Sequence, residues 1–395
     1  MKTNWLGQEL ELTISKVAHG GVFVARHENR VVFVSHAIPG EKVVARVFED
    51  NGGSYARAET IQVLEASPDR VPHFWKKSAI AGGVEFGHIA LSRQRELKAE
   101  VLKEGLERFA KLDSSVPVES IDDDETGLHY RTRIQLHVNE FGDAGFYRER
   151  SHEVVKVKSI PLAVPEIEEL GLHLKNWQNV KKIQIAASNT GGLQWLVDKK
   201  VQGDQVLLES VLGRTYRLSP GAFWQVHKNA ARVLSQTVID FARDVGLEKQ
   251  ADNLDLYGGA GLFSGSLAGA FGQDIKLTSV ETSKVAVSDA QKNLADLTRF
   301  KAVATSTMDF LKRTASLDAA STVILDPPRS GAGREVITEL VRLEPKHLIY
   351  VACDPIALAR DLGQLVPAGY KILKMRAFDL FPHTHHFETV VSLVR

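Results

Sequence analysis

The C-terminal half of the sequence alternates short apolar segments with helical ones from about residue 221 onward. The apolar segments lie near residues 253–257, 277–281, 322–326, 348–353, 371–378 and 389–394. Strands that alternate with helices are typical of a doubly wound α/β sheet, in which most strands run parallel. We therefore predict such a sheet, with the last of these segments as an edge strand.

The N-terminal half has a different, strand-rich pattern. Residues 1–67 contain five short strand-like runs separated by Gly- and Asn-rich turns, which is typical of a small β-barrel. Apolar residues at helical spacing predict a helix within 88–111, and residues 128–213 return to strand-like alternation. Because 395 residues exceed one ordinary core, we expect three domains. Their predicted bounds are 1–67, 68–213 and 214–395.

Composition narrows the class of protein. The chain has 44% hydrophobic and 25% charged residues, as soluble globular proteins do, and no segment approaches the roughly 20 apolar residues that span a bilayer. The N-terminus lacks a signal-peptide pattern. One cysteine allows no internal disulfide and no Cys-rich metal site, so we expect a reducing, cytoplasmic location. The formal net charge of zero neither requires nor excludes a nucleic-acid partner.

A Gly-rich turn predicts a cofactor site. Residues 254–261 place Gly259 and Gly261 where a strand passes into a helix, so the backbone can approach a ligand closely. Glu281 ends the next strand, at the position of an acid that binds ribose hydroxyls. This pattern suits a nicotinamide dinucleotide or S-adenosyl-L-methionine, and a purely structural turn is the alternative. A carboxylate in the turn, Asp255, favours the cationic methyl donor over a pyrophosphate.

Two further segments point to methyl transfer with a covalent step. Asp326 is followed by two prolines, a sequence that closes a strand in many methyltransferases acting on nucleic acids. Enzymes of that kind that methylate exocyclic amines carry an aromatic residue next, whereas this chain has Arg329. The sole cysteine, Cys353, ends an apolar run at the sheet edge where ligands bind. A lone thiol is usually a small buried hydrophobe, but Glu388 downstream and the cradle upstream favour covalent catalysis.

These motifs resemble those of the S-adenosyl-L-methionine-dependent RNA uracil-C5 methyltransferases. The resembling segments follow the family's order along nearly the whole chain, at residues 223–226, 255–261, 325–329, 350–355 and 381–388. The first 67 residues resemble the TRAM barrel of the ribosomal-RNA branch, which forms 5-methyluridine in 23S rRNA. The resemblance implies a class I, Rossmann-like methyltransferase domain, an N-terminal TRAM/OB-like barrel and a central β-rich domain.

The chemistry follows from the substrate and from these residues. Carbon C5 of uracil is a poor nucleophile, and a thiolate that adds to C6 converts C5 into an enolate-like carbon. We assign that thiolate to Cys353, which requires a depressed thiol pKa or a base nearby. The C5 proton must leave after methyl transfer, and Glu388 is the candidate general base. Asp326 and Arg329 are candidates for holding the uracil's polar edge or the methionine end of the cofactor.

The resemblance also assigns cofactor contacts. It points to Gln225 for the methionine part, Tyr257 for the adenosyl pocket, and Glu281 and Asp326. Leu262 replaces a polar side chain found in many members, which weakens a contact there, and Asp354 stands where Asn is frequent.

Related enzymes with this barrel often hold an iron–sulfur cluster with four cysteines. The corresponding stretch here, residues 72–86, keeps a Gly-Gly pair but has no cysteine. We therefore expect no cluster and no metal. Phe74, Trp75, Val84 and Phe86 are candidates to fill that space by apolar packing.

RNA is the expected partner, and basic residues interleaved with aromatic ones mark candidate contacts. Within residues 130–158, phosphate contacts are expected from Arg131, Arg133, Arg148 and Arg150, beside the aromatic rings of Phe146 and Tyr147. The target uracil must leave its stack to reach the thiol, and Phe223 is the candidate for lining its pocket.

Three other classes remain open. An amine-directed nucleic-acid methyltransferase would leave Cys353 idle, and a non-catalytic RNA-binding or ribosome-assembly factor would move no methyl group. A dinucleotide oxidoreductase fits the cradle but gives no purpose to Cys353 and Glu388. We expect a monomer without membrane contact that acts on structured RNA, ribosomal in preference to transfer RNA; the sequence does not identify the nucleotide.

Overall fold

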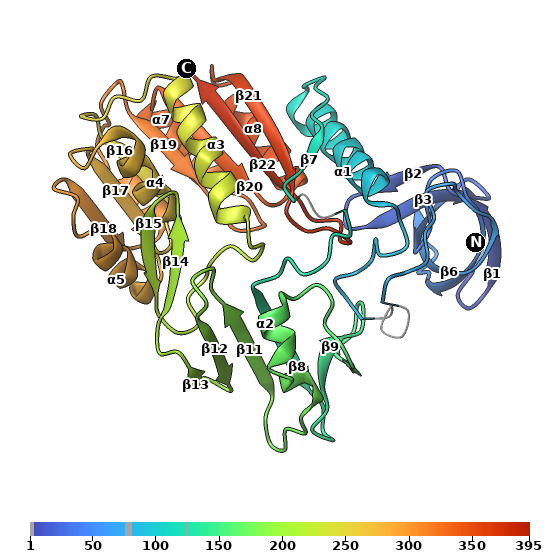
Figure 1. The fold of residues 1–395 in the computed structure, drawn as a ribbon. Coiled ribbons are helices and arrows are strands. Elements are labelled where there is room, and N and C mark those ends of the chain that lie inside the picture. Colours follow the sequence, from blue (N-terminus) through green and yellow to red (C-terminus); the bar gives the residue numbers. More distant parts are fainter. Residues whose placement is uncertain (1–3, 76–80, 123–124) are drawn as a thin grey trace.

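The computed structural model describes residues 4–75, 81–122 and 125–395. Figure 1 shows a curled N-terminal sheet, a central antiparallel sheet and a larger C-terminal α/β sheet, with α1 (Leu91–Gly105) between the first and the last. Within the described residues, no helix has the combined length and apolarity needed to cross a bilayer.

The N-terminal sheet has six strands where five were expected. Its order is β1-β5-β6-β4-β3-β2, so that the first two strands lie at opposite ends of a strongly curled sheet. The predicted first strand divides because the Ile14 amide donates to the Glu41 carbonyl, next to β5, whereas the Ser15 amide donates to Val24 in β3. The strands are β1 (Glu9–Thr13), β2 (Lys16–Ala18), β3 (Val22–His27), β4 (Arg30–Ser35), β5 (Lys42–Glu49) and β6 (Tyr55–Glu65).

The central sheet is covered on one face. Alternate residues such as Ile134 and Ile183 are buried, and α2 (Pro165–Glu169) packs against β11 on that side. Residues of the other face, among them Gln135 and Gln184, are half-exposed. The six antiparallel strands, in the order β10-β9-β8-β11-β12-β13, are β8 (Arg133–Val138), β9 (Ala144–Tyr147), β10 (Val154–Lys156), β11 (Lys182–Ala187), β12 (Leu193–Val197) and β13 (Lys200–Gly203).

The C-terminal sheet has eight strands in the order β18-β17-β16-β19-β20-β22-β21-β7. The first five run parallel, and β22 is antiparallel to both of its neighbours. Its strands are β16 (Asn253–Leu256), β17 (Leu277–Glu281), β18 (Phe300–Ala304), β19 (Thr322–Leu325), β20 (His347–Ala352), β21 (Lys371–Asp379), β22 (Glu388–Val394) and β7 (Val118–Ser120).

The prediction that the last segment is an edge strand was wrong. β22 lies between β20 and β21 and is buried along most of its length, because its apolar side chains face helices on both sides of the sheet. The edges are β18 and β7, neither of which was expected. None of the five residues of β18 is fully buried, as fits a strand at the edge of the sheet.

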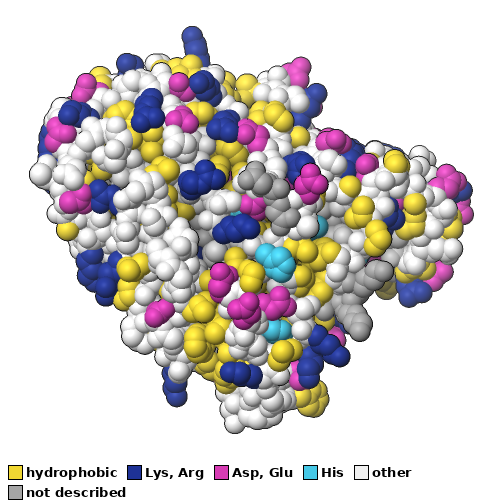
Figure 2. All heavy atoms as spheres, in the orientation of Figure 1, with side chains coloured by type: hydrophobic (Ala, Val, Ile, Leu, Met, Phe, Trp, Pro, Cys, Tyr) yellow, Lys and Arg dark blue, Asp and Glu magenta, His cyan; other side chains and the backbone are white. Residues whose placement is uncertain are grey.

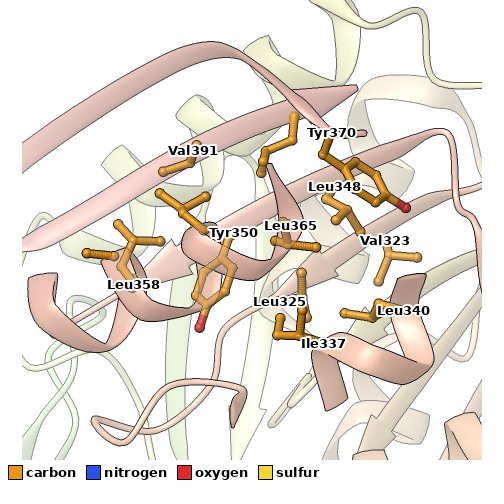
Figure 3. Packing of buried hydrophobic residues seen from close by; sticks show 14 of the residues in the cluster. Val323, Leu325, Ile337, Leu340, Leu348, Tyr350, Leu358, Leu365, Tyr370 and Val391 are labelled. Atoms are coloured by element: carbon orange, nitrogen blue, oxygen red, sulfur yellow. The ribbon is translucent and has the colours of Figure 1, made fainter. Parts of the chain in front are cut away.

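Helices cover both faces of this sheet. Residues of α6, α7 and α8 belong to one hydrophobic cluster, in which Figure 3 shows Leu325 of the sheet beside Ile337 of α7 and Leu348 beside Leu365 of α8. Residues of α3 and α4 belong to the cluster on the other face. The helices are α3 (Ala230–Asp244), α4 (Leu262–Phe271), α5 (Lys284–Asn293), α6 (Thr307–Arg313), α7 (Gly333–Leu343) and α8 (Pro355–Leu365).

The packing differs from the predicted division at residues 68–213. The expected helix is present as α1 and continues as a π-helical turn, Leu106–Ala110; both pack on α8, and β7 pairs with β21. The hairpin of β14 (Leu207–Val211) and β15 (Arg214–Leu218) also packs in the C-terminal cluster. These segments join the C-terminal α/β body because their apolar side chains are buried there.

Candidate active site

The predicted nucleophile and general base lie at the ends of neighbouring strands. Ala352, the last residue of β20, pairs with Thr389 in β22. Cys353 follows this pair on one strand and Glu388 precedes it on the other, so thiol and carboxyl leave the ladder at adjacent positions. Cys353 is half-buried and Glu388 is buried. The sheet topology thus places the two groups together, out of bulk water.

Asp326 and Arg329, from the loop after β19, lie close enough to Cys353 and Glu388 to act on both electrostatically. Burial raises the pKa of Glu388 well above its ordinary value, the Asp326 carboxyl raises it further, and Arg329 opposes both. Burial, followed by the charge of Asp255, raises the pKa of Asp326 to about 7. The carboxyls that interact here, those of Glu388, Asp326 and Asp255, therefore outnumber the one cation that opposes them, Arg329.

The thiol is not activated by a depressed pKa. Burial, then the carboxyls of Glu388 and Asp326, raise the pKa of Cys353 to about 12, against the opposing charge of Arg329. A nucleophilic thiol was expected to have either a lowered pKa or a base nearby. The structure shows no lowered pKa, but it places carboxyls that could act as a base near Cys353.

The acidic excess fits a cationic ligand. Glu388 Oε2 and Asp255 Oδ1 are buried and find no hydrogen-bond partner within the part of the chain that the structure describes. A buried carboxylate oxygen without a partner is costly unless a ligand completes its bonding. S-adenosyl-L-methionine carries sulfonium and ammonium cations, so the residues present fit this cofactor.

The Gly-rich turn after β16 forms the expected cradle. Gly259 and Gly261 have φ of 53° and 90°, in the left-handed region that favours glycine. A Cβ added at Gly258 would lie 2.1 Å from Ser279 Oγ, closer than any side chain tolerates. The Gly259 amide donates to Glu281 Oε2 at 3.3 Å, which places this acid at the end of β17 beside the turn.

Asp255 lies elsewhere than predicted. It is inside β16 rather than in the turn, and its Oδ2 accepts hydrogen bonds from the Oγ and the amide of Ser264, at 2.6 and 3.0 Å. Burial raises its pKa to about 6 against these hydrogen bonds. One oxygen of Asp255 therefore fixes the first turn of α4, and Oδ1 is the atom left for a ligand.

The other cofactor candidates flank the cradle. Tyr257 follows β16 with φ of 65°, and burial raises the pKa of its hydroxyl. Gln225 lies half-buried in the segment that leads from β15 into α3. No hydrogen bond within the described residues fixes the Gln225 side chain, so its cofactor contact stays a prediction.

The turn before Glu388, residues 380–387, is held in place by α1. The amide of Gln94, which is 0% exposed, donates to the Ile89 carbonyl at 2.8 Å and accepts from the His383 amide at 2.7 Å. The sequence analysis missed this residue. Its signal is a glutamine on the apolar face of a helix, where a polar side chain needs partners.

Lys98, one helical turn after Gln94, holds the start of the same turn. Its Nζ donates to Asp379 Oδ1 at 2.6 Å and to the Phe381 carbonyl at 3.1 Å, and both charged side chains are buried. On the opposite side, the Tyr130 hydroxyl donates to the Pro382 carbonyl at 3.1 Å. Contacts from α1 and from the central domain thus determine where Glu388 enters β22.

The N-terminal barrel closes one side of the thiol pocket. Its β2–β3 turn lines a narrow cavity together with Cys353, and His19 Nε2 lies 2.8 Å from Asp354 Oδ2. The other oxygen of Asp354 accepts the amides of Ile356 and Ala357 and so caps α8. Asp354, the residue after Cys353, therefore joins the barrel to the C-terminal sheet.

The four arginines predicted to bind RNA have different environments. Three are paired with carboxylates of this chain, Arg133 with Glu209, Arg148 with Glu153 and Arg150 with Glu149, at 2.8, 2.9 and 3.1 Å. The Arg133 pair is largely buried and joins β8 to β14, so its charge serves the fold, which corrects its predicted role as a free phosphate contact. Arg131 has no carboxylate within ion-pair distance among the described residues.

Arg148 and Arg150 line a groove of about 600 Å³ with Phe146, Tyr147 and the two histidines that also border the Cys353 cavity, His385 and His386. Figure 2 shows histidine and acidic side chains gathered near the middle of this face, with lysines and arginines spread around them. No large field of one sign covers this view. An RNA ligand would therefore be held by local contacts rather than by net charge.

The stretch related to a cluster-binding segment is packed with apolar side chains where it is described. Trp75 and Val84 belong to the central hydrophobic cluster, Phe74 packs against it, and Phe86 belongs to the barrel cluster. Residues 76–80 lie outside the described residues. Among those that are described, no group of three or more potential ligands is placed to hold a metal ion.

The sheet, the cradle and the thiol–carboxyl pocket define an S-adenosyl-L-methionine-dependent methyltransferase that acts on RNA. A model of the tRNA (uracil-5-)-methyltransferase family matches residues 196–395, and a TRAM domain model matches residues 5–61. The chain belongs to this methyltransferase family.

Relatives and a solved structure agree with that membership. An uncharacterized RNA methyltransferase of Streptomyces avermitilis is 38% identical to this chain over 98% of the chain and 98% of the relative. One of Streptomyces coelicolor is 36% identical over 98% of the chain and 93% of the relative. The crystal structure of Pyrococcus abyssi tRNA (uracil-54, C5)-methyltransferase with S-adenosyl-L-homocysteine covers 98% of this chain and 100% of its own, with a TM-score of 0.75 and 21% identity. At that identity the likeness shows the fold, which confirms the predicted barrel and methyltransferase domain.

Proposed function

We propose that this enzyme methylates C5 of a uridine in RNA through a covalent bond between Cys353 Sγ and C6 of the uracil, with Glu388 as general base. The observation that carries this proposal is the adjacency of thiol and carboxyl at the ends of β20 and β22. An amine-directed enzyme would need neither group.

The first step uses the thiol. The Asp326 carboxylate takes the Sγ proton, which leaves Glu388 free to act later, and the thiolate adds to C6. The electrons of the C5–C6 double bond then move toward C5 and the O4 carbonyl, and the Arg329 guanidinium balances the developing charge. S-adenosyl-L-methionine supplies the methyl group as an electrophilic sulfonium substituent.

The last step uses the carboxylate. After methylation C5 carries both a methyl group and a proton, and Glu388 removes that proton. The electrons of the C–H bond re-form the double bond, the C6–Sγ bond breaks, and the thiolate of Cys353 is restored. The raised pKa of Glu388 suits a group that must take up a proton here.

Ribosomal RNA is the proposed substrate, on the resemblance of the N-terminal barrel. Transfer RNA is the second candidate, since the Pyrococcus abyssi tRNA methyltransferase matches over 98% of this chain, a span that includes most of the barrel. We further propose a monomer that works in the cytoplasm, where such RNAs are processed.

The test is methyl transfer from labelled S-adenosyl-L-methionine to unmodified ribosomal and transfer RNA, with nucleosides identified by mass spectrometry. We expect 5-methyluridine with the wild type and none with Cys353→Ala, while both proteins bind the cofactor. Methylation that survives Cys353→Ala, or a methylated amine, would overturn the proposal. Cofactor binding without transfer to either RNA would favour the RNA-binding factor.

A further inference from the structure

A second cavity, separate from the thiol pocket, lies between the open face of the central sheet and the segment that leads into α3. Its volume is about 370 Å³, within the usual range of small-ligand sites. Arg131, Gln184 and Phe223 line it, and none of them lines the cavity that contains Cys353. Phe223, predicted to line the target-uracil pocket, thus lines this second cavity and not the one that contains Cys353.

The Phe223 side chain offers an unused aromatic face. It is 72% exposed, whereas its neighbour Trp224 is buried in the methyltransferase core. An exposed ring at the mouth of a cavity is suited to stack on a base, and stacking on aromatic side chains is how proteins commonly hold unpaired nucleotides.

Gln184 offers an unused amide. It lies on β11 directly opposite Gln135 of β8, on the open face of the sheet. The Gln135 amide contacts His137, but the half-buried Gln184 side chain has no hydrogen bond among the residues that the structure describes. A glutamine amide has both donor and acceptor atoms, as base edges require.

Arg131 offers a cation. Its neighbour in this cavity, Arg133, is neutralised by Glu209, whereas Arg131 has no such carboxylate in the described chain and lies 6.0 Å from the centre of the Tyr130 ring. An arginine that no carboxylate neutralises is suited to phosphate. One cavity thus holds a group for each part of a nucleotide: Phe223 for the face of the base, Gln184 for its edge and Arg131 for the phosphate.

We propose that this cavity binds an unpaired nucleotide of the RNA substrate adjacent to the target uridine. The base stacks on Phe223, its edge bonds to Gln184 and its phosphate lies on Arg131. The site is joined to the reaction centre through the chain itself, because Tyr130, next to Arg131, donates to Pro382 in the turn that leads to Glu388. This inference rests on the proposed function, since it takes RNA as the substrate.

Binding of a fluorescein-labelled single-stranded ten-nucleotide oligouridylate, measured by fluorescence anisotropy, tests the site. Phe223→Ala and Gln184→Leu should each weaken binding at least about fivefold, the lower end of what one stacked or hydrogen-bonded base contributes. Matched controls are Phe141→Ala, which removes another exposed ring (69% exposed), and Gln202→Leu, which changes an exposed glutamine of β13. The controls should leave binding unchanged.

A second measurement separates this inference from the proposed function. In the methylation assay, Phe223→Ala and Gln184→Leu should raise KM for RNA by a similar factor with little change in kcat. If the wild type makes 5-methyluridine and both variants bind and react like wild type, the second site is refuted while the function stands. If the wild type methylates no uridine but the variants still lose oligonucleotide binding, the function fails and the site stands. Competition by free uridine monophosphate, with oligonucleotide binding unaffected by the variants, would instead identify a free-nucleotide site and overturn the assignment to RNA.

Discussion

Cys353 and Glu388 flank the same backbone pair of the β20–β22 ladder, although 35 positions separate them in the sequence (388 − 353). The carboxyl raises the pKa of the thiol, and burial raises the pKa of the carboxyl itself. In the absence of a ligand, the surroundings therefore favour the protonated form of both groups. A cationic cofactor and a polar substrate are needed to bring them to the charge states that the reaction uses.

Replacing Glu388 by glutamine should separate the two halves of the reaction. The amide keeps the size of the side chain but cannot remove the C5 proton, so turnover should fall by about 10²–10⁴-fold. The methylated RNA should remain bound to Cys353, visible as a protein–RNA band that survives denaturing electrophoresis. Glu388→Gln/Cys353→Ala should show no such band, and a single variant that turns over without accumulating it would remove Glu388 from the base role.

The acidic pocket makes a prediction about stability and pH. Burial raises the pKa of Asp326 in the folded protein to about 7, above its ordinary value of 3.8. The folded state therefore binds more protons than the unfolded state between about pH 4 and pH 7, and this group makes the protein less stable as pH rises through that window. Asp326→Asn should raise the Tm of the ligand-free enzyme at pH 8 by at least about 2–4 °C, the shift that 1 kcal/mol gives in a body of this size.

Scanning calorimetry of both proteins at pH 4.5 and pH 8 measures this effect. The difference in Tm should shrink at the lower pH, where Asp326 is protonated in the fold. Equal differences at both pH values would show that the substitution acts through packing instead.

Gln94 should act as a positioning residue for Glu388. Gln94→Ala leaves the His383 amide and the Ile89 carbonyl without their partner, which should lower the free energy of unfolding by about 1–3 kcal/mol. Because the turn before Glu388 loses its anchor, the covalent RNA adduct should also accumulate relative to released product.

The control is Asn253→Ala. Asn253 is a buried amide in β16 that bonds to the Glu248 carbonyl and the Thr322 amide, away from the thiol pocket. It should cost similar stability without changing the ratio of adduct to product. The same ratio in both variants would mean that Gln94 has a structural role alone.

Asp354 tests whether the barrel contact needs a carboxylate. Asp354→Asn keeps an oxygen that can accept the amides of Ile356 and Ala357, and the contact with His19 is partly exposed. The free energy of unfolding should therefore change by less than about 1 kcal/mol. Asp354→Ala also removes the helix cap and should cost about 1 kcal/mol more. Chemical denaturation measures both; equal losses would mean that the cap contributes nothing.

Sequence patterns predicted which strand ends carry the candidate residues, because the carboxyl ends of parallel strands share an edge of the sheet. Glu281, Asp326 and Cys353 each follow an apolar run, and parallel strands bring such positions to one side of the sheet. The order of strands is a different matter. Nothing in the run at 388–394 shows that it inserts between β20 and β21, since pairing depends on partners distant in the sequence.

Local sequence patterns also do not predict polar contacts between residues that lie far apart in the sequence. Arg133 was predicted as a phosphate contact because it stands among basic and aromatic residues, but its carboxylate partner, Glu209, comes from a hairpin 76 positions later. Gln94 and Lys98 lie on a helix whose apolar spacing predicts the helix itself. That spacing does not predict which partners its buried polar side chains contact. Local pattern indicates element type, whereas tertiary contacts decide which charge is free.

The insertion of β22 between two earlier strands sets a condition on biosynthesis. During translation the cysteine leaves the ribosome well before the strand that carries the carboxyl, and N-terminal parts of a chain fold first. Until residue 394 has been made, the sheet has a gap beside β20, and Cys353 has no Glu388 next to it. A chain that stops before β22 therefore has no Glu388 carboxyl beside Cys353, so the candidate site forms only when this strand has joined the sheet.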